Sequence, residues 1–70
     1  MRGFATFIGR LKSSTYAQQG IEQIKGMGVK YKQYVGPAVV TMLENIKTER
    51  TKLSDDASVK AIDEAIKQIQ

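Results

Sequence analysis

The 70-residue chain contains no cysteine, no histidine and no tryptophan, and it has a single proline. Without cysteine it cannot form a disulfide, and without cysteine or histidine it lacks the usual ligands of transition-metal sites. The missing histidine also removes the base that most often activates a serine nucleophile. No catalytic, cofactor or metal motif takes their place. We therefore expect a protein that is not an enzyme and has no cofactor, metal or small-molecule substrate.

Long apolar runs are also missing. The longest, from Val35 to Leu43, is nine residues long and contains Gly36, Pro37 and Thr41, whereas a membrane-spanning helix needs about 20 apolar residues. The chain is therefore expected to lie on a membrane or attach to something in it without crossing it. No segment alternates apolar and polar residues for long enough to predict strands.

The glycines and the proline are distributed unevenly. All six glycines and Pro37 precede residue 38, so the second half of the chain is the better intrinsic helix. A chain of this size buries only about 60% of the surface that its unfolded form exposes. We expect an all-α protein of two to four short helices, extended or folded as a helical hairpin, without a large independent core. Its expected segments are a basic amphipathic helix or arm (1–18), a Gly-interrupted helical segment (19–36), and a helical hairpin or bent helix (37–70).

The C-terminal segment has the clearest helical pattern. Ser54 is expected to cap a helix whose first turn holds Asp55 and Asp56, and this position explains both carboxylates without a metal or acid–base role. The helix is expected from Asp55 to Ile69. Its apolar residues recur every three or four positions, and this spacing predicts a packing seam of Val59, Ile62, Ile66 and Ile69.

A second helix is expected to begin at Pro37, because proline is favoured in a first helical turn. Its charged residues, Arg50 among them, are predicted to face solvent. The preceding segment predicts a further packing seam, in which Gly28 either allows close helix approach or, with Gly26, ends a helix. The members of this second seam are Ile21, Ile24, Gly28, Tyr31 and Val35.

The net positive charge of the chain comes from its first half. Residues 1–36 hold six basic side chains and one acidic side chain, and the first 21 residues hold no acid at all. On a helical wheel, this start separates apolar from basic residues. Such a segment resembles mitochondrial targeting segments and helices that lie on anionic membranes. We expect it to be a retained docking helix whose membrane or partner contacts are Phe4, Phe7, Ile8 and Leu11 with Arg2, Arg10 and Lys12.

Two alternatives involve other partners. The segment from Lys25 to Tyr34 mixes lysines with tyrosines, which could neutralise phosphates and stack on bases. It could equally place Tyr31 on an apolar seam, with lysine stems covering its edges. An independent basic module that binds nucleic acid is therefore one alternative. A homo-oligomeric bundle built on the Val59–Ile69 seam is the other.

The thin core and the basic amphipathic start together favour a structural role. The leading hypothesis is a small non-catalytic accessory subunit of a larger assembly of the respiratory-chain or ATP-synthase type. Its expected partners are protein subunits, with contact to a lipid surface, and its expected location is the mitochondrial inner membrane. The alternative location is the cytoplasm.

Overall fold

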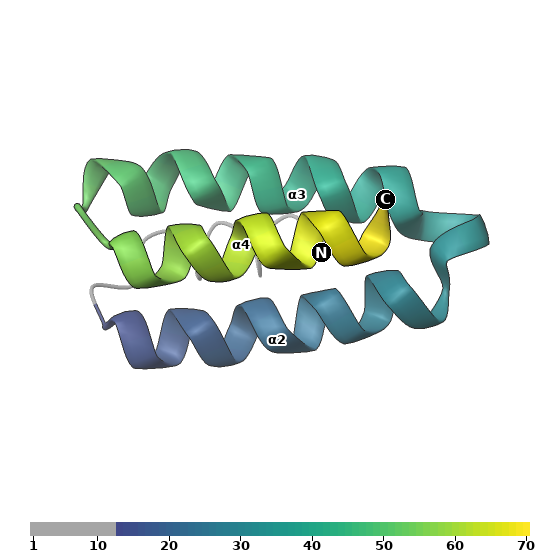
Figure 1. Ribbon diagram of the computed structural model, residues 1–70, viewed down its shortest axis with the longest axis horizontal. Coiled ribbons are helices and arrows are strands. Elements are labelled where there is room, and N and C mark those ends of the chain that lie inside the picture. Colours follow the sequence, from purple (N-terminus) through teal and green to yellow (C-terminus); the bar gives the residue numbers. More distant parts are fainter. Residues whose placement is uncertain (1–12) are drawn as a thin grey trace.

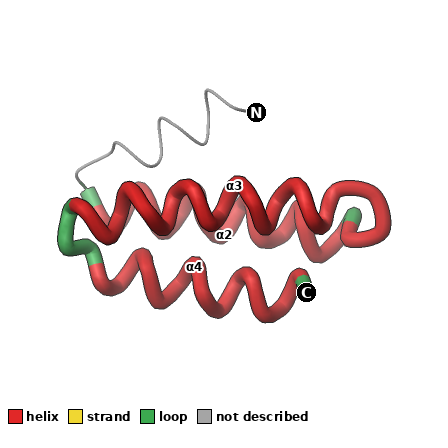
Figure 2. The backbone as a smooth tube through the Cα atoms, turned by 90° about the horizontal axis from the view of Figure 1, so that it is seen from above, coloured by secondary structure: helices red, strands yellow, loops and turns green. Residues whose placement is uncertain are grey.

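The computed structural model describes residues 13–70, and these residues form three α-helices that pack as an up-down-up bundle (Figure 1). Helix α2 spans Ser14–Lys30, α3 spans Lys32–Lys52 and α4 spans Asp56–Ile69. Each helix contacts both others. The all-α prediction is confirmed, and the last two helices form the expected hairpin. Because α2 packs against that hairpin, the described chain is a compact bundle and not an extended structure (Figure 2).

Helix α2 begins at a capping serine and continues past both of its later glycines. The Ser13 hydroxyl accepts a hydrogen bond from the Tyr16 N–H at 3.4 Å and so satisfies one of the free donors of the first turn. Gly26 and Gly28 both lie within the helix. Of the two alternatives for this segment, a helix that ends near residue 26 is therefore not observed.

The reversal between α2 and α3 takes place at one residue, Tyr31. Its N–H donates to the Met27 carbonyl oxygen at 2.9 Å and closes α2, while its own carbonyl accepts from the Val35 N–H at 2.9 Å and opens α3. The predicted helix start at Pro37 is therefore wrong, because α3 starts at Lys32 and contains Pro37. Pro37 is the sixth residue of α3 and lies beyond its first turn, so the helix continues through it without the i→i−4 hydrogen bond that an N–H at this position would donate.

The core lies along the line where the three helices meet. Each of the three described helices buries three apolar side chains, spaced three or four residues apart. Burial of this apolar surface is the main force that holds the helices together. The buried apolar residues are Ala17, Ile21, Ile24, Val39, Leu43, Ile46, Ile62, Ala65 and Ile69.

The connection from α3 to α4 is a Schellman-type turn followed immediately by a helix cap. The N–H of Ser54 donates to the Thr51 carbonyl oxygen at 3.0 Å, and the N–H of Asp55 donates to that of Arg50 at 2.9 Å. Asp55 then caps α4 by accepting from the Ser58 N–H at 3.3 Å. The predicted cap, Ser54, is wrong by one residue, because Ser54 occupies the left-handed position of the turn with a φ of 56°.

Ser54→Gly is expected to stabilise the protein by about 1 kcal/mol. A left-handed conformation costs an L-residue about 1–2 kcal/mol, whereas glycine adopts it without this steric cost. Chemical denaturation of both proteins measures the difference. Ser54→Ala is the control, since it keeps the strained Cβ and removes only the hydroxyl. Equal stability of the glycine and alanine variants would contradict this explanation of the turn.

Candidate docking surface

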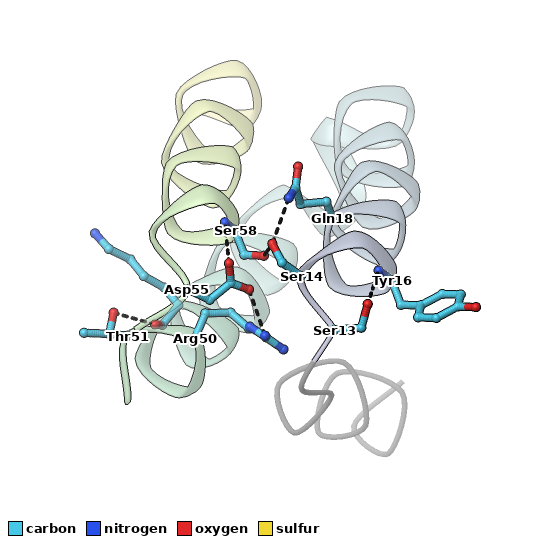
Figure 3. A network of polar contacts seen from close by, with 9 residues as sticks. Ser13, Ser14, Tyr16, Gln18, Arg50, Thr51, Asp55 and Ser58 are labelled. Atoms are coloured by element: carbon cyan, nitrogen blue, oxygen red, sulfur yellow. Dashed lines mark hydrogen bonds and ion pairs between the residues drawn. The ribbon is translucent and has the colours of Figure 1, made fainter. Parts of the chain in front are cut away.

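A buried polar junction ties the three helices together at the α3–α4 turn (Figure 3). The Arg50 Nη2 atom lies 2.8 Å from the Asp55 Oδ2 atom, and both side chains are withdrawn from solvent. The Ser58 hydroxyl, from α4, lies 3.4 Å from the Ser14 hydroxyl of α2, which accepts a hydrogen bond from the Gln18 amide at 2.9 Å. Side chains from α2, α3 and α4 thus meet around one carboxylate.

The surroundings of Asp55 favour its charged form. Burial by itself raises the pKa of this carboxyl, but the Ser58 hydroxyl, the Ser14 hydroxyl and the Ser58 N–H act in the opposite direction. The positive charge of Arg50 also lowers it, and the resulting pKa lies below the ordinary aspartate value. The junction is therefore held together by a carboxylate that stays ionised in the folded protein.

The lowered pKa of Asp55 predicts a loss of stability in acid. The contribution of Asp55 is fully present above the unfolded-state pKa of about 3.9 and disappears as the pH falls through the lower folded-state value. Urea denaturation of the wild type and of Asp55→Asn from neutral to strongly acidic pH should therefore show a stability gap that narrows only below about pH 4. Asp56→Asn, which removes a neighbouring exposed carboxylate, is the control. A gap that is constant with pH would contradict the assignment.

The polar junction is a structural feature and not a reactive site. Arg50 and Ser58 are fully buried, so a substrate has no access to them. Asp55 is engaged with the Arg50 side chain and the Ser58 N–H. Within residues 13–70, no group of three or more acidic side chains converges as a cation site would require.

The opposite end of the bundle exposes apolar and basic side chains together. Tyr34 is 82% exposed and Tyr31 is 46% exposed, although aromatic side chains of this size are usually well covered. The Lys30 Nζ atom lies 5.4 Å from the centre of the Tyr31 ring, within the range of a cation–π contact. We call this surface the lysine–tyrosine end, and it consists of Met27, Val29, Lys30, Tyr31, Lys32 and Tyr34.

The lysine–tyrosine end belongs to an acid-free part of the bundle. Every acidic side chain of the protein lies at position 22 or between positions 44 and 64. All charged side chains in the last half of α2, the first half of α3 and the last turn of α4 are therefore positive. Of these, Lys25 is paired with Glu22 at 3.0 Å. The α3–α4 turn with the polar junction lies at the other end of the bundle (Figure 1). The acidic side chains therefore lie in the middle of the bundle and toward that turn, and the lysine–tyrosine end has none.

A mostly apolar groove opens beside Lys32, between α3 and the end of α4. Its volume is about 440 Å³. Gly36 leaves it open, because a glycine adds no side chain to its wall. The groove is lined by Lys32, Gly36, Pro37, Val40, Ile69 and Gln70.

The structure distributes the two predicted packing seams over the bundle interior and its surface. Ile21, Ile24 and Gly28 are buried on one face of α2. Tyr31 does not continue that face: the seam prediction assumed an unbroken helix, whereas Tyr31 is the turn residue and stays exposed. Val35 lies in the next helix and is partly buried against the core.

On α4, the interior set is slightly rotated from the predicted seam. Ile62 and Ile69 are fully or almost fully buried, and Ile66 is partly buried. Val59 is also only partly covered, while Ala65 takes a buried position that the prediction left out. The difference arises because α4 packs against two helices at once and needs a wider buried face than a two-helix seam.

The predicted contacts in the N-terminal segment lie outside the residues that the structure describes. These contacts are Phe4, Phe7, Ile8 and Leu11 with Arg2, Arg10 and Lys12. Within residues 13–70, no helix combines the length and the apolarity required to cross a membrane.

Arg50 is the main residue that the sequence prediction placed wrongly. It was expected to face solvent because it is charged, but it is fully buried. Its spacing contained the signal: Arg50 follows Val39, Leu43 and Ile46 on the same helical face at intervals of four, three and four. The acid at position 55 supplies the partner that makes burial of the guanidinium possible.

The fold and the surface of residues 13–70 define a class, a small all-α bundle of three described helices with a basic, tyrosine-bearing end. In comparisons with known proteins, no family model, no curated protein and no solved structure matches this chain.

Proposed function

We propose that this protein is a small non-catalytic accessory subunit of a larger, membrane-associated assembly and that it docks through its lysine–tyrosine end. The observation that carries the proposal is the exposure of Tyr31 and Tyr34 beside Lys30 and Lys32, at an end of the bundle without acidic side chains. Exposed aromatic residues in a group mark interaction surfaces. The unopposed lysines add attraction to an acidic or anionic partner.

The packing of the bundle supports docking by one end and not by a helical seam. Ile62 and Ile69 are covered within the chain itself, so these seam residues are not available to a second copy. This removes the observation that motivated a homo-oligomeric bundle. The three-helix core leaves the ends and the outer helix faces as the surfaces for partners.

The proposed location is the mitochondrial inner membrane, in an assembly of the respiratory-chain or ATP-synthase type. Its support is the composition of residues 1–21, which contain three basic side chains, both phenylalanines and no acid. A segment of this kind is also suited to an anionic membrane surface. It would act together with the lysine–tyrosine end, which carries the same sign of charge.

Native electrophoresis of membranes solubilised in mild detergent tests the proposed function. The 7.8 kDa chain should migrate with a much larger assembly, and the double variant Lys30→Glu/Lys32→Glu should migrate alone. The matched control is Lys52→Glu/Lys60→Glu, which changes the net charge by the same amount near the opposite end of the bundle and should stay in the assembly. Migration of the wild type as a free chain would contradict the proposal, and so would equal release of both variants.

A further inference from the structure

We propose that the lysine–tyrosine end binds the interface of an anionic phospholipid membrane, with its tyrosines among the headgroups and its lysines on lipid phosphates. This inference rests on the proposed function and specifies the partner of the same surface. It is carried by three features of the described chain: the kind of apolar side chains exposed, the distribution of charge and the groove beside Lys32.

The exposed apolar side chains suit a membrane interface. Tyr31 and Tyr34 each combine an apolar ring with a hydroxyl, and tyrosine is enriched where hydrocarbon meets water. Met27 and Val29 are also exposed, at 42% and 45%. They are wholly apolar and sit on the last turn of α2, next to the tyrosines in the chain. The end of the bundle thus offers apolar atoms to the acyl boundary and hydroxyls to the headgroup layer.

The charge distribution of the bundle attracts the lysine–tyrosine end to an anionic membrane. Lys30 and Lys32 flank Tyr31, and Lys67 lies in the last turn of α4, while the acids of α3 and α4 lie between positions 44 and 64. A lysine close to an anionic membrane contributes about fivefold to binding. The lysine–tyrosine end has no acidic side chain that opposes this attraction, so the bundle is expected to approach the membrane with the α2–α3 turn first.

The groove gives the membrane a further contact. It runs beside Lys32 and is bordered mainly by Gly36, Pro37, Val40 and Ile69. A phospholipid acyl chain is apolar and narrow enough to lie in such a groove, and the headgroup phosphate of the same lipid would then lie within reach of the Lys32 side chain at the rim. Lys32 therefore joins the charged part of the surface to its apolar part.

A nucleic acid is the less suitable partner for this end. The acid-free part of the described chain has four lysines and no arginine, whereas arginine is the residue that forms bidentate contacts with phosphate. One of the four, Lys25, is already paired with Glu22. Met27 and Val29 have no aromatic face on which a base could stack. The described end thus offers few phosphate contacts and a large apolar contribution.

Sedimentation of the full chain with vesicles tests the inference. The wild type should bind vesicles of equal parts phosphatidylcholine and phosphatidylserine, and should not bind pure phosphatidylcholine. Lys30→Glu/Lys32→Glu should weaken binding by about thirtyfold or more, which corresponds to the loss of two lysine contributions. Lys52→Glu/Lys60→Glu, with the same net charge, should bind nearly as well as the wild type.

Two further variants test how much the exposed apolar side chains contribute to vesicle binding. Tyr34→Ala should weaken binding severalfold, and Leu53→Ala, which removes an exposed apolar side chain from the opposite turn, should leave it unchanged. Circular dichroism confirms that each variant keeps its helices. If the glutamate variant at positions 30 and 32 loses helicity, Lys30→Gln/Lys32→Gln replaces it, with Lys52→Gln/Lys60→Gln as its control.

Three results would overturn the inference: no binding of the wild type to anionic vesicles, equal weakening by both charge variants, or tighter binding to single-stranded RNA than to vesicles. The second result would assign binding to net charge or to residues 1–12, which all variants keep. Failure here is distinguishable from failure of the proposed function. If native assembly still requires Lys30 and Lys32 while vesicles do not bind, the surface docks to protein.

Discussion

Arg50→Ala is expected to lower the free energy of unfolding by about 3–5 kcal/mol, because breaking a buried ion pair leaves an uncompensated buried charge. Arg50 is fully buried and its Nη2 atom lies 2.8 Å from the Asp55 carboxylate. A bundle of this size rarely has more than about 3–5 kcal/mol of total stability. The variant should therefore be largely unfolded at 25 °C, as measured by circular dichroism and urea titration.

Two further variants distinguish the effect of losing the ion pair from the effect of any substitution near the end of α3. Lys52→Ala removes an exposed cation from the same turn and should change stability by no more than about 0.5 kcal/mol. Arg50→Met combined with Asp55→Ser replaces both charges while retaining a hydroxyl to cap α4, and should recover most of the loss. An Arg50→Ala variant as stable as Lys52→Ala would contradict the structural role of the junction.

Alanine at two neighbouring glycines of α2 is expected to have opposite effects. A Cβ at Gly26 meets nothing within 4 Å, so Gly26→Ala should stabilise the protein by about 0.5–1 kcal/mol through helix propensity. A Cβ at Gly28 would lie 2.7 Å from the Ile69 Cδ1 atom and 2.9 Å from the Val39 Cγ1 atom. The isoleucine tip can move, but the branched valine of α3 is stiff, so α2 and α3 must move apart.

The difference between the two variants isolates the cost of overpacking, because both gain the same helix propensity. Overpacking of a core typically costs about 1–3 kcal/mol, so Gly28→Ala should be less stable than Gly26→Ala by that amount. Thermal or chemical denaturation of the two proteins measures it. Equal stability would mean that α2 does not approach α3 and α4 as closely at Gly28 as the structure shows.

The features that could be predicted from the sequence are those set by local spacing. The regular recurrence of Ile62, Ile66 and Ile69, without glycine or proline nearby, was enough to place α4. The short connection after Lys52 was compatible with a hairpin or with one bent helix, and the structure shows the hairpin. The placement of α4 follows from helical periodicity and helix propensity, which act over a few residues.

The features that could not be predicted depend on partners distant in the sequence. Arg50 is buried only because the turn brings the Asp55 carboxylate next to it. Because Arg50 is charged, it was assigned to the surface although its helical spacing matches that of the buried residues of α3. Tyr31 carries the chain reversal without a glycine or proline at that position, so no turn signal marked it. Tyr31 of the lysine–tyrosine end was consequently assigned to a buried seam, although it is exposed.

The absence of tryptophan provides a direct test of which end docks, because one introduced indole reports on a single position. Tyr34→Trp places it at the lysine–tyrosine end and Leu53→Trp places it at the opposite turn, both at exposed positions. On addition of anionic vesicles to each full-length variant, the emission of Tyr34→Trp should shift to shorter wavelength and return with added salt. That of Leu53→Trp should stay unchanged. A shift at position 53 alone, or equal shifts at both positions, would contradict the account.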